Sequence, residues 1–288
     1  MNLKKILDNS KNVAALLSED QLKEIAHNVV EGYDTDLSSR ASWEKDVKKY
    51  LKLALQISEE KNFPWPGAAN VKYPMISTAA MQFAARAYPT LVPSTGNLVN
   101  IAVISGTQSQ EQYQRARNVS KYMSYQILNE MPDWEEGMDN LLLICSIFGL
   151  AYKKVFYSPD LGTNCAELIN PFNLVVNYWT KDLCSAPRVS EVIYKTAREV
   201  EEKKRAGLYL DVELGKPRIV ENLKEDINVS KNMTPPAVED ETTPYMLIEQ
   251  HTFLDLDKDG YSEPYIVLVE YGSKKVLRIV PRFDIEVS

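Results

Sequence analysis

A change in the spacing of apolar residues near residue 150 constrains the fold of this chain more than any other sequence feature. Before it, apolar residues such as Leu22, Ile25 and Val29 recur at helical spacing. After it, short runs rich in β-branched and aromatic residues alternate with turn residues, as in strands. Helices followed by strands are typical of α+β folds. We therefore predict a helical part over residues 1–150 and a mostly antiparallel, β-rich part over residues 151–288.

The helical part is expected to contain five helices. Ser18 is followed by Gln21 at the spacing of a capping box, which marks the start of the first helix. Pro89 and Pro93 are expected to end the third helix, and Gly149 the fifth. The predicted helices are 18–30, 43–60, 75–88, 107–130 and 134–148.

The second part is expected to hold strands and one short charged helix, residues 196–206. Residues 222–243 contain few large apolar residues and a Pro-Pro pair, so we expect a flexible loop or insertion there. The final run, RIVPRFDIEVS, is broken by proline and lacks a cap, so we expect the native fold to continue beyond it. The predicted strands are 151–157, 165–169, 173–178 and a meander of 245–254, 265–271 and 275–280, with Gly260 and Gly272 in its turns.

The stretch FPWPGAANVKYPMISTAAMQFAARAYPTLVP, residues 63–93, combines five prolines with an alanine-rich helix. Pro64 and Pro66 fix φ and remove two backbone donors, so residues 62–67 are expected to form a stiff extended loop. The helix that follows carries a face of small residues, which allows another element to approach closely. The members of this face are Ala79, Ala80, Ala84, Ala85 and Ala87.

The usual signatures of enzymes are absent from the sequence. There is no P-loop, no G-x-G-x-x-G and no G-x-S-x-G, and only His27 and His251 offer imidazoles. Three widely spaced cysteines, an odd number, fit a reducing compartment better than a disulfide framework. We therefore expect no enzyme and no cofactor.

The charge and hydropathy of the chain exclude two further classes of protein. A net charge of -7 predicts no strongly basic clamp for nucleic acid, although a protein that encloses DNA without gripping it is still possible. The longest apolar run, residues 141–152, is about half of a ~20-residue membrane span, so no membrane association is expected.

The motif DLDKDG is the one metal-like pattern. Asp255, Asp257 and Asp259 occupy loop positions 1, 3 and 5 of an EF-hand, and a glycine follows at position 6. Glu263 at position 9 could add an oxygen, but position 12 is Ile266 instead of glutamate. Two interpretations stay open: a weak Ca²⁺ site, or a hairpin turn that uses Asp and Gly for their turn conformations.

A second group of candidate residues lies on the polar helix expected over 107–130. Arg115, Arg117 and Lys121 could lie near a DNA backbone, or they could form an ordinary charged surface.

Four stretches in this order resemble the portal proteins of tailed bacteriophages, the head–tail connector family. They begin with YDTDLSSRASWEKDVKKYLKLALQ, residues 33–56, and the stretch 63–93, in which WPGAANVKYP is the most specific element. INPFNLVVNYWTKDLCSAPRV, residues 169–189, and EQHTFLDLDKDGYSEPYIVLV, residues 249–269, follow. Portals of this type are longer than 288 residues, so the chain resembles their N-terminal, mostly wing-like part.

The resemblance implies a structural role. Portal proteins form a ring, typically of twelve subunits, at one vertex of the capsid, and double-stranded DNA passes through its channel without sequence-specific binding. The implied partners are further copies of the chain, the terminase, the major capsid or scaffolding protein and tail adaptor proteins. The implied location is the virion, after assembly in the host cytoplasm.

The resemblance also suggests residues that would pack at a subunit interface. These are Trp65, Pro66, Gly67, Tyr73, Ala80, Ala84 and Arg86. Two alternatives are another phage capsid or adaptor protein, and a calcium-binding module with an unseen activity centred on DLDKDG.

Overall fold

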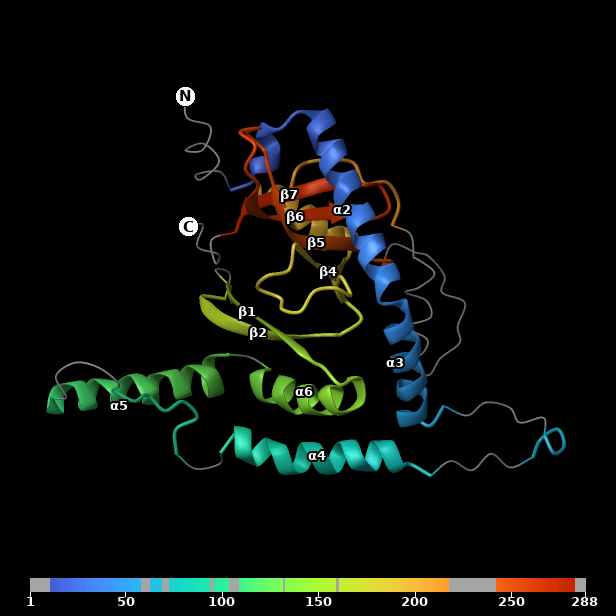
Figure 1. The fold of residues 1–288 in the computed structure, drawn as a ribbon. Helices are drawn as coiled ribbons and strands as arrows, with labels where there is room; N and C mark the ends of the chain where they lie inside the picture. The colour runs from blue at the N-terminus through green and yellow to red at the C-terminus, as the bar shows by residue number, and fades with distance from the viewer. Residues whose placement is uncertain are drawn as a thin grey trace. The chain divides into compact units, whose positions relative to one another are not determined.

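The computed structural model describes residues 11–57, 63–68, 73–93, 96–103, 109–131, 133–158, 161–217 and 242–282. Helices dominate the first half and antiparallel sheets the second, so the predicted α+β class is confirmed (Figure 1). The chain forms two compact units. Unit 1 comprises residues 1–45 and 172–288, and unit 2 comprises residues 46–171. The boundary that we expected near residue 150 lies inside unit 2, because β2 packs against α6 there.

Unit 1 is built on a five-stranded antiparallel sheet. Its order, β3-β4-β5-β6-β7, follows the order of the chain, so the predicted meander is confirmed as its last three strands. β4 was not predicted. The strands are β3 (Leu174–Val176), β4 (Arg188–Lys195), β5 (Tyr245–Leu254), β6 (Glu263–Glu270) and β7 (Lys275–Pro281).

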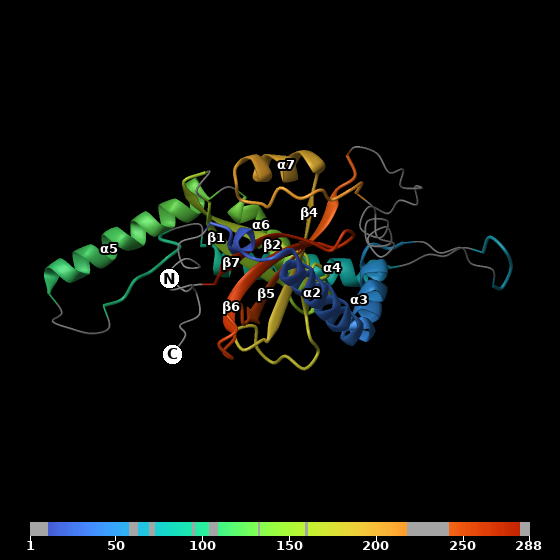
Figure 2. The same ribbon diagram turned by 90° about the horizontal axis from the view of Figure 1, so that it is seen from above.

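Helices cover both faces of this sheet (Figure 2). The 3₁₀ turn η1 (Val13–Leu16) and helix α2 (Glu19–Ser39) share one apolar core with the sheet, and α7 (Ala197–Arg205) shares the other. Strand side chains alternate between faces. Leu247 therefore joins the α7 core while its neighbour Ile248 joins the α2 core, and both are fully buried.

Local sequence explains where these helices begin and end. Ser18 and Thr196 each form a complete capping box, at the starts of α2 and α7. The helix predicted over 43–60 is observed as α3 (Ala41–Ala54), which is shorter at its C-terminal end. It ends in a Schellman motif, because Gln56 adopts φ 55° and the amide of Ile57 donates to the carbonyl of Lys52 at 3.0 Å.

Unit 2 contains helices and a hairpin. α6 packs against both α4 and β2. Gly149 adopts the left-handed conformation and ends α6 as predicted. The elements are α4 (Met75–Leu91), α5 (Gln110–Tyr125), the π-helical turn η2 (Gln126–Glu130), α6 (Trp134–Phe148), β1 (Tyr152–Ser158) and β2 (Thr163–Ile169).

The prediction that Pro89 ends α4 is wrong. Pro89 lies in the last turn, where it removes only one helical hydrogen bond, and the amide of Val92 still donates to the carbonyl of Tyr88 at 2.8 Å. The helix therefore continues to Leu91.

Some predictions fall outside the described residues. These are most of the loop expected over 222–243 and the last six residues of the chain. Within the described ranges, no helix is both long enough and apolar enough to cross a membrane.

Candidate functional sites

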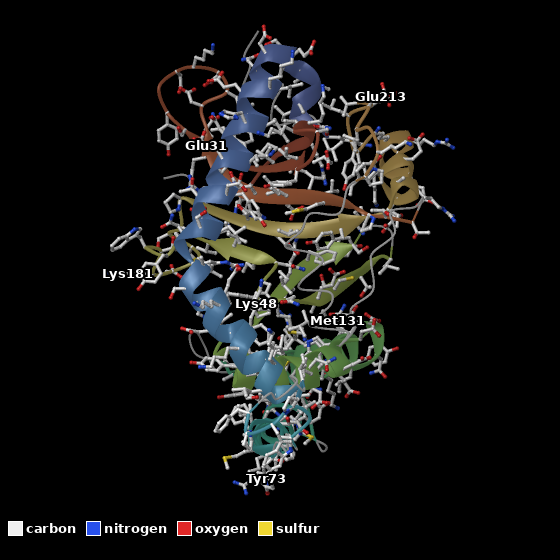
Figure 3. The ribbon with its side chains drawn as sticks, turned by 90° about the vertical axis from the view of Figure 1, so that its right-hand side faces the viewer. Glu31, Lys48, Tyr73, Met131, Lys181 and Glu213 are labelled. Carbon is white, nitrogen blue, oxygen red and sulfur yellow. The ribbon has the colours of Figure 1, made fainter. Side chains whose placement is uncertain are left out.

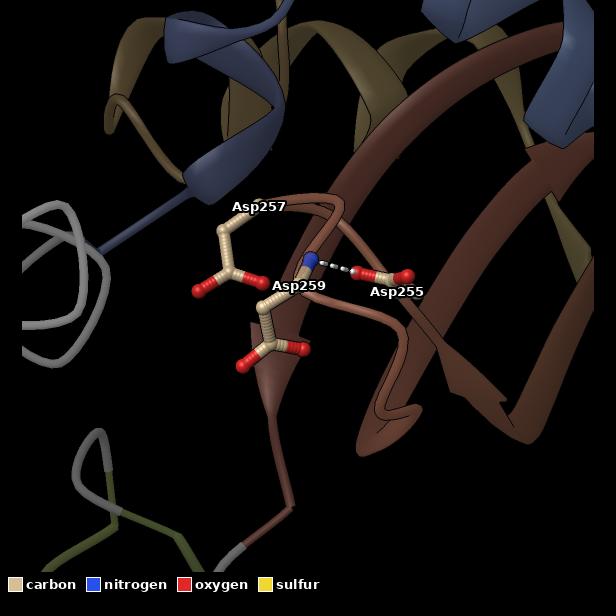
Figure 4. Close-up of side chains that lie close together, drawn as sticks. All are labelled: Asp255, Asp257 and Asp259. Carbon is tan, nitrogen blue, oxygen red and sulfur yellow. Dashed lines mark hydrogen bonds between the residues drawn. The ribbon is translucent and has the colours of Figure 1, made fainter.

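The turn between β5 and β6 brings three carboxylates together. Asp255, Asp257 and Asp259 each offer one side-chain oxygen, and these three oxygens lie within 4.8 Å of one another (Figure 4). The spacing of one residue between successive acids therefore does place them at a common point, as the sequence predicted.

Backbone hydrogen bonds set the shape of this loop. The Asp255 carboxylate accepts from the amides of Asp259, at 3.2 Å, and Gly260, at 3.0 Å, and the Asp259 carboxylate accepts from the amide of Tyr261 at 2.8 Å. Lys258 and Gly260 adopt positive φ values of 61° and 92°. Asp255 and Asp259 thus stabilise the turn, as the hairpin interpretation of DLDKDG predicted.

Asp257 differs from its neighbours. Its Oδ1 atom is buried and has no hydrogen-bond partner among the described residues. A buried carboxylate oxygen without a donor is costly, and the cost is greater beside two further carboxylates. A bound cation would remove both penalties.

The donor set suits a hard cation that is held weakly. Carboxylate oxygens are preferred by Ca²⁺, which takes six to eight ligands. Glu263, expected as a further ligand, accepts a hydrogen bond from the hydroxyl of Tyr265 at 3.1 Å, and Ile266 lies within β6. The protein would therefore supply mainly three carboxylates, and water would supply the other ligands.

The histidines and cysteines do not form a comparable group. His27 faces Glu31 at 3.5 Å and His251 faces Glu249 at 3.8 Å, while the three cysteines are free and scattered. Among the described residues, the acidic loop is the only group of three or more such ligands that could share an ion.

The interface residues suggested by resemblance fall into two sets. Trp65 and Tyr73 are 64% and 80% exposed, and Pro66, Gly67 and Arg86 are exposed as well. Figure 3 shows Tyr73 beside α4 at the margin of unit 2. In contrast, Ala80 and Ala84 are only 5% and 3% exposed.

The two buried alanines lie in the contact between α4 and α6 of the same chain. The expected close packing is therefore present, but inside the subunit. The side of α4 opposite these alanines holds the exposed polar residues Gln82 and Arg86, and large apolar side chains are exposed around the rest of the helix. We call the exposed large apolar side chains of this helix the α4 outer face: Met75, Ile76, Met81, Phe83 and Leu91.

The basic residues of α5 lie on two sides of the helix. Arg117 and Lys121 are four positions apart and share one side, whereas Arg115 lies on another and pairs with Glu111 at 2.6 Å. They do not form one continuous basic face. The inner side of α5 holds Ser120 and Ser124, which bond to the backbone of Val99.

An acidic group at the start of α6 was missed by the sequence analysis. We call it the α6 acidic cluster; its members, all exposed, are Asp133, Glu135, Glu136 and Asp139. A signal was present, because residues 130–152 contain five acidic residues and no Lys or Arg. Scoring charge helix by helix would have found it.

No protein-family model and no curated protein matches this chain. The resemblance to portal proteins is therefore supported by the quoted motifs alone.

Proposed function

We propose that this chain is a subunit of a phage portal: a ring at the capsid vertex that conducts DNA during packaging and ejection. In this role it would dock the terminase and later the tail adaptor proteins. The proposal depends on the four motif stretches and their order. The structural observation that supports it is the distribution of apolar side chains between the two units.

Unit 1 holds both of the large apolar cores found among the described residues. Most of the exposed large apolar side chains lie in unit 2. On the α4 outer face, Met75, Met81 and Phe83 are 68%, 57% and 48% exposed. Large exposed apolar patches mark interaction sites. Unit 2 is therefore the part of the chain best suited to contact other molecules.

A ring also requires contacts of a particular kind. Each subunit must present two different surfaces, one to each neighbour, in a head-to-tail arrangement. The α4 outer face and the exposed Trp65 would form one such surface.

Native mass spectrometry and negative-stain electron microscopy of the purified chain test the proposal. We expect one closed assembly with a central opening. A chain that stays monomeric at high concentration, or that stops at a two-fold dimer, would contradict it.

A matched pair of tryptophan variants tests the surface. Trp65→Ala removes a 64% exposed ring in unit 2, and Trp179→Ala removes an 84% exposed ring in unit 1. Both should leave the free energy of unfolding within about 0.5 kcal/mol of wild type, because neither side chain is buried. We expect Trp65→Ala to weaken assembly more; the reverse order would place the contact on unit 1.

A second candidate function is calcium binding in the acidic loop, favoured by the buried, unpartnered Oδ1 of Asp257. For a dissociation constant of about 1 mM, 10 mM Ca²⁺ should add about 1.4 kcal/mol of stability. Asp257→Asn should raise stability without calcium, because it removes repulsion, and should abolish the response to calcium. Asp182→Asn, an exposed loop acid, is the control. No calcium-dependent shift in Tm for wild type would exclude the site.

A further inference from the structure

In unit 2, α5 carries exposed basic side chains and the start of α6 carries exposed acidic ones. The α6 acidic cluster has four exposed carboxylates, and none of them forms an ion pair with another described residue. The ammonium of Lys153, which donates to the carbonyl of Trp134 at 3.4 Å, lies beside this turn, so four carboxylates face one cation and the surface is net negative. A cationic partner would stabilise this surface.

The cluster lies beside the end of α4. Burial raises the pKa of the Tyr88 hydroxyl, and the negative charges of Glu135 and Asp139 raise it further. Glu135 and Asp139 are four residues apart, so they share one side of α6 and face the same region as Tyr88.

A complementary surface exists on α5. Tyr113, Arg117, Lys121 and Tyr125 follow one another at intervals of four residues, so they form one row along the helix. We call it the α5 basic row. Tyr113 and Tyr125 are 44% and 54% exposed, and neither Arg117 nor Lys121 forms an ion pair within the described part of the chain. Tyrosine and arginine are both enriched where proteins bind one another.

We propose that the α5 basic row of one subunit docks on the α6 acidic cluster of a second copy of this chain. The contact is head-to-tail, because it joins two different surfaces, and its extension to a ring rests on the proposed function. Charge complementarity identifies the partner: the same chain carries exposed charges of both signs, and neither the two cations nor the four carboxylates form an ion pair within the described residues.

DNA fits the basic row less well. Affinity for DNA comes from neutralising many phosphates, and here only two cations share a side, while Arg115 is paired with Glu111. The net charge of -7 also opposes a stable complex with a polyanion.

Charge reversal on each surface provides the test. Sedimentation velocity at about 50 mM salt would compare wild type with Arg117→Glu/Lys121→Glu and with Glu135→Lys/Asp139→Lys. Each double variant should weaken self-association about 10-fold or more, since attraction becomes repulsion. Lys45→Glu/Lys49→Glu, an exposed pair at the same spacing on α3, is the matched control and should have a much smaller effect.

Mixing the two reversed variants gives the decisive result. Their surfaces are again complementary, so the mixture should assemble although each variant alone does not. All four side chains are exposed, so circular dichroism and Tm should show normal folding. Failure of the mixture to assemble, or unchanged assembly of either variant alone, would overturn the proposal.

The same experiment separates this contact from the other possibilities. If Arg117→Glu/Lys121→Glu abolishes binding of a DNA duplex and leaves self-association intact, the α5 basic row binds DNA and the proposal is overturned. A mixture that assembles only to dimers supports the contact and contradicts the ring, whereas a ring that ignores both reversals supports the ring and contradicts the contact.

Discussion

The fully buried carboxylate of Asp36 joins α2 to both ends of the loop between β3 and β4. Arg188, at the start of β4, donates to it through Nε at 2.6 Å and Nη2 at 2.8 Å, and Asn177, after β3, donates at 2.7 Å. We predict that Asp36→Asn, a change of nearly equal volume, strongly destabilises unit 1.

The magnitude follows from counting donors. The asparagine side chain has one acceptor oxygen and brings two donors of its own, so at least one of the three incoming hydrogen bonds is lost and donors face donors. Arg188 keeps its charge, since the bond to Asp36 raises its already high pKa. Removing one partner of a buried ion pair costs about 3–5 kcal/mol. The Arg188 side chain is 32% exposed, so water recovers part of this, and we expect a loss of about 2–4 kcal/mol.

Urea unfolding followed by circular dichroism measures this loss. The control is Glu24→Gln, an exposed charge on the same helix, which should change the free energy of unfolding by less than about 0.5 kcal/mol. If Asp36→Asn were as mild as this control, the buried carboxylate would not hold the loop and the reasoning would fail.

Two further predictions concern the edge of the sheet and acid stability. Asn12→Ala removes four hydrogen bonds, two of them to the edge strand β7. It should lower the free energy of unfolding in urea by about 2–3 kcal/mol, whereas the exposed control Asn28→Ala should lower it by about 0.5 kcal/mol or less. Equal losses would contradict a role of Asn12 in covering the edge of the sheet. Hydrogen bonds from the Thr196 amide and then from Lys195 lower the pKa of Glu199, so its carboxylate contributes stability above pH 4.5 that is lost as the pH falls through the lowered pKa. Glu199→Gln should therefore reduce the loss of stability between pH 6 and pH 3, by at most about 0.5 kcal/mol because the side chain is 43% exposed. A larger loss in the variant than in wild type would refute the sign.

Local signals in the sequence were sufficient for several features whose cause is local. The capping box at Ser18, the left-handed Gly149 and the alternating run 245–254 each depend on residues within a few positions of one another, and each was predicted. Pro89 was misjudged for a related reason. The effect of a proline depends on how many helical residues follow it, and here only two do.

β4 escaped prediction because a polar residue occupies a buried position of the strand. Ser190 is fully buried, which breaks the apolar alternation that marks strands. Its hydroxyl oxygen accepts from the side-chain Nε2 of Gln250 at 2.9 Å, and the same Nε2 also donates to the carbonyl of Val29 in α2. The partners that make Ser190 acceptable inside the fold lie 60 or more positions away, where spacing rules do not extend.

The same limit explains the division into units. α2 belongs with a sheet that begins more than 130 residues later, and it is attached partly by polar groups on its inner side. Asp36 lay beyond the helix predicted over 18–30 and was not singled out, because only the folded chain extends α2 to Ser39 and brings Arg188 and Asn177 to this carboxylate. A single sequence shows that Asp36 is charged but not that its charge is balanced 152 residues away.

The alanine-rich helix α4 shows how the structure redirects the search for a partner surface. Its small residues predicted a close approach, and the sequence could not say whether the neighbour was another helix of the same chain or another subunit. α6 occupies that position and buries Ala80 and Ala84. Met81 and Phe83, which the sequence analysis did not single out, are left 57% and 48% exposed on the two flanks of the helix. Burial of apolar surface stabilises a contact by about 25 cal/mol per Å². Met81 and Phe83 still have exposed surface to bury, whereas the two alanines are already covered and would add little. The residues to mutate when looking for a neighbouring subunit are therefore these large ones, and a loss of assembly in Phe83→Ala together with normal Tm would locate the contact on the outer face.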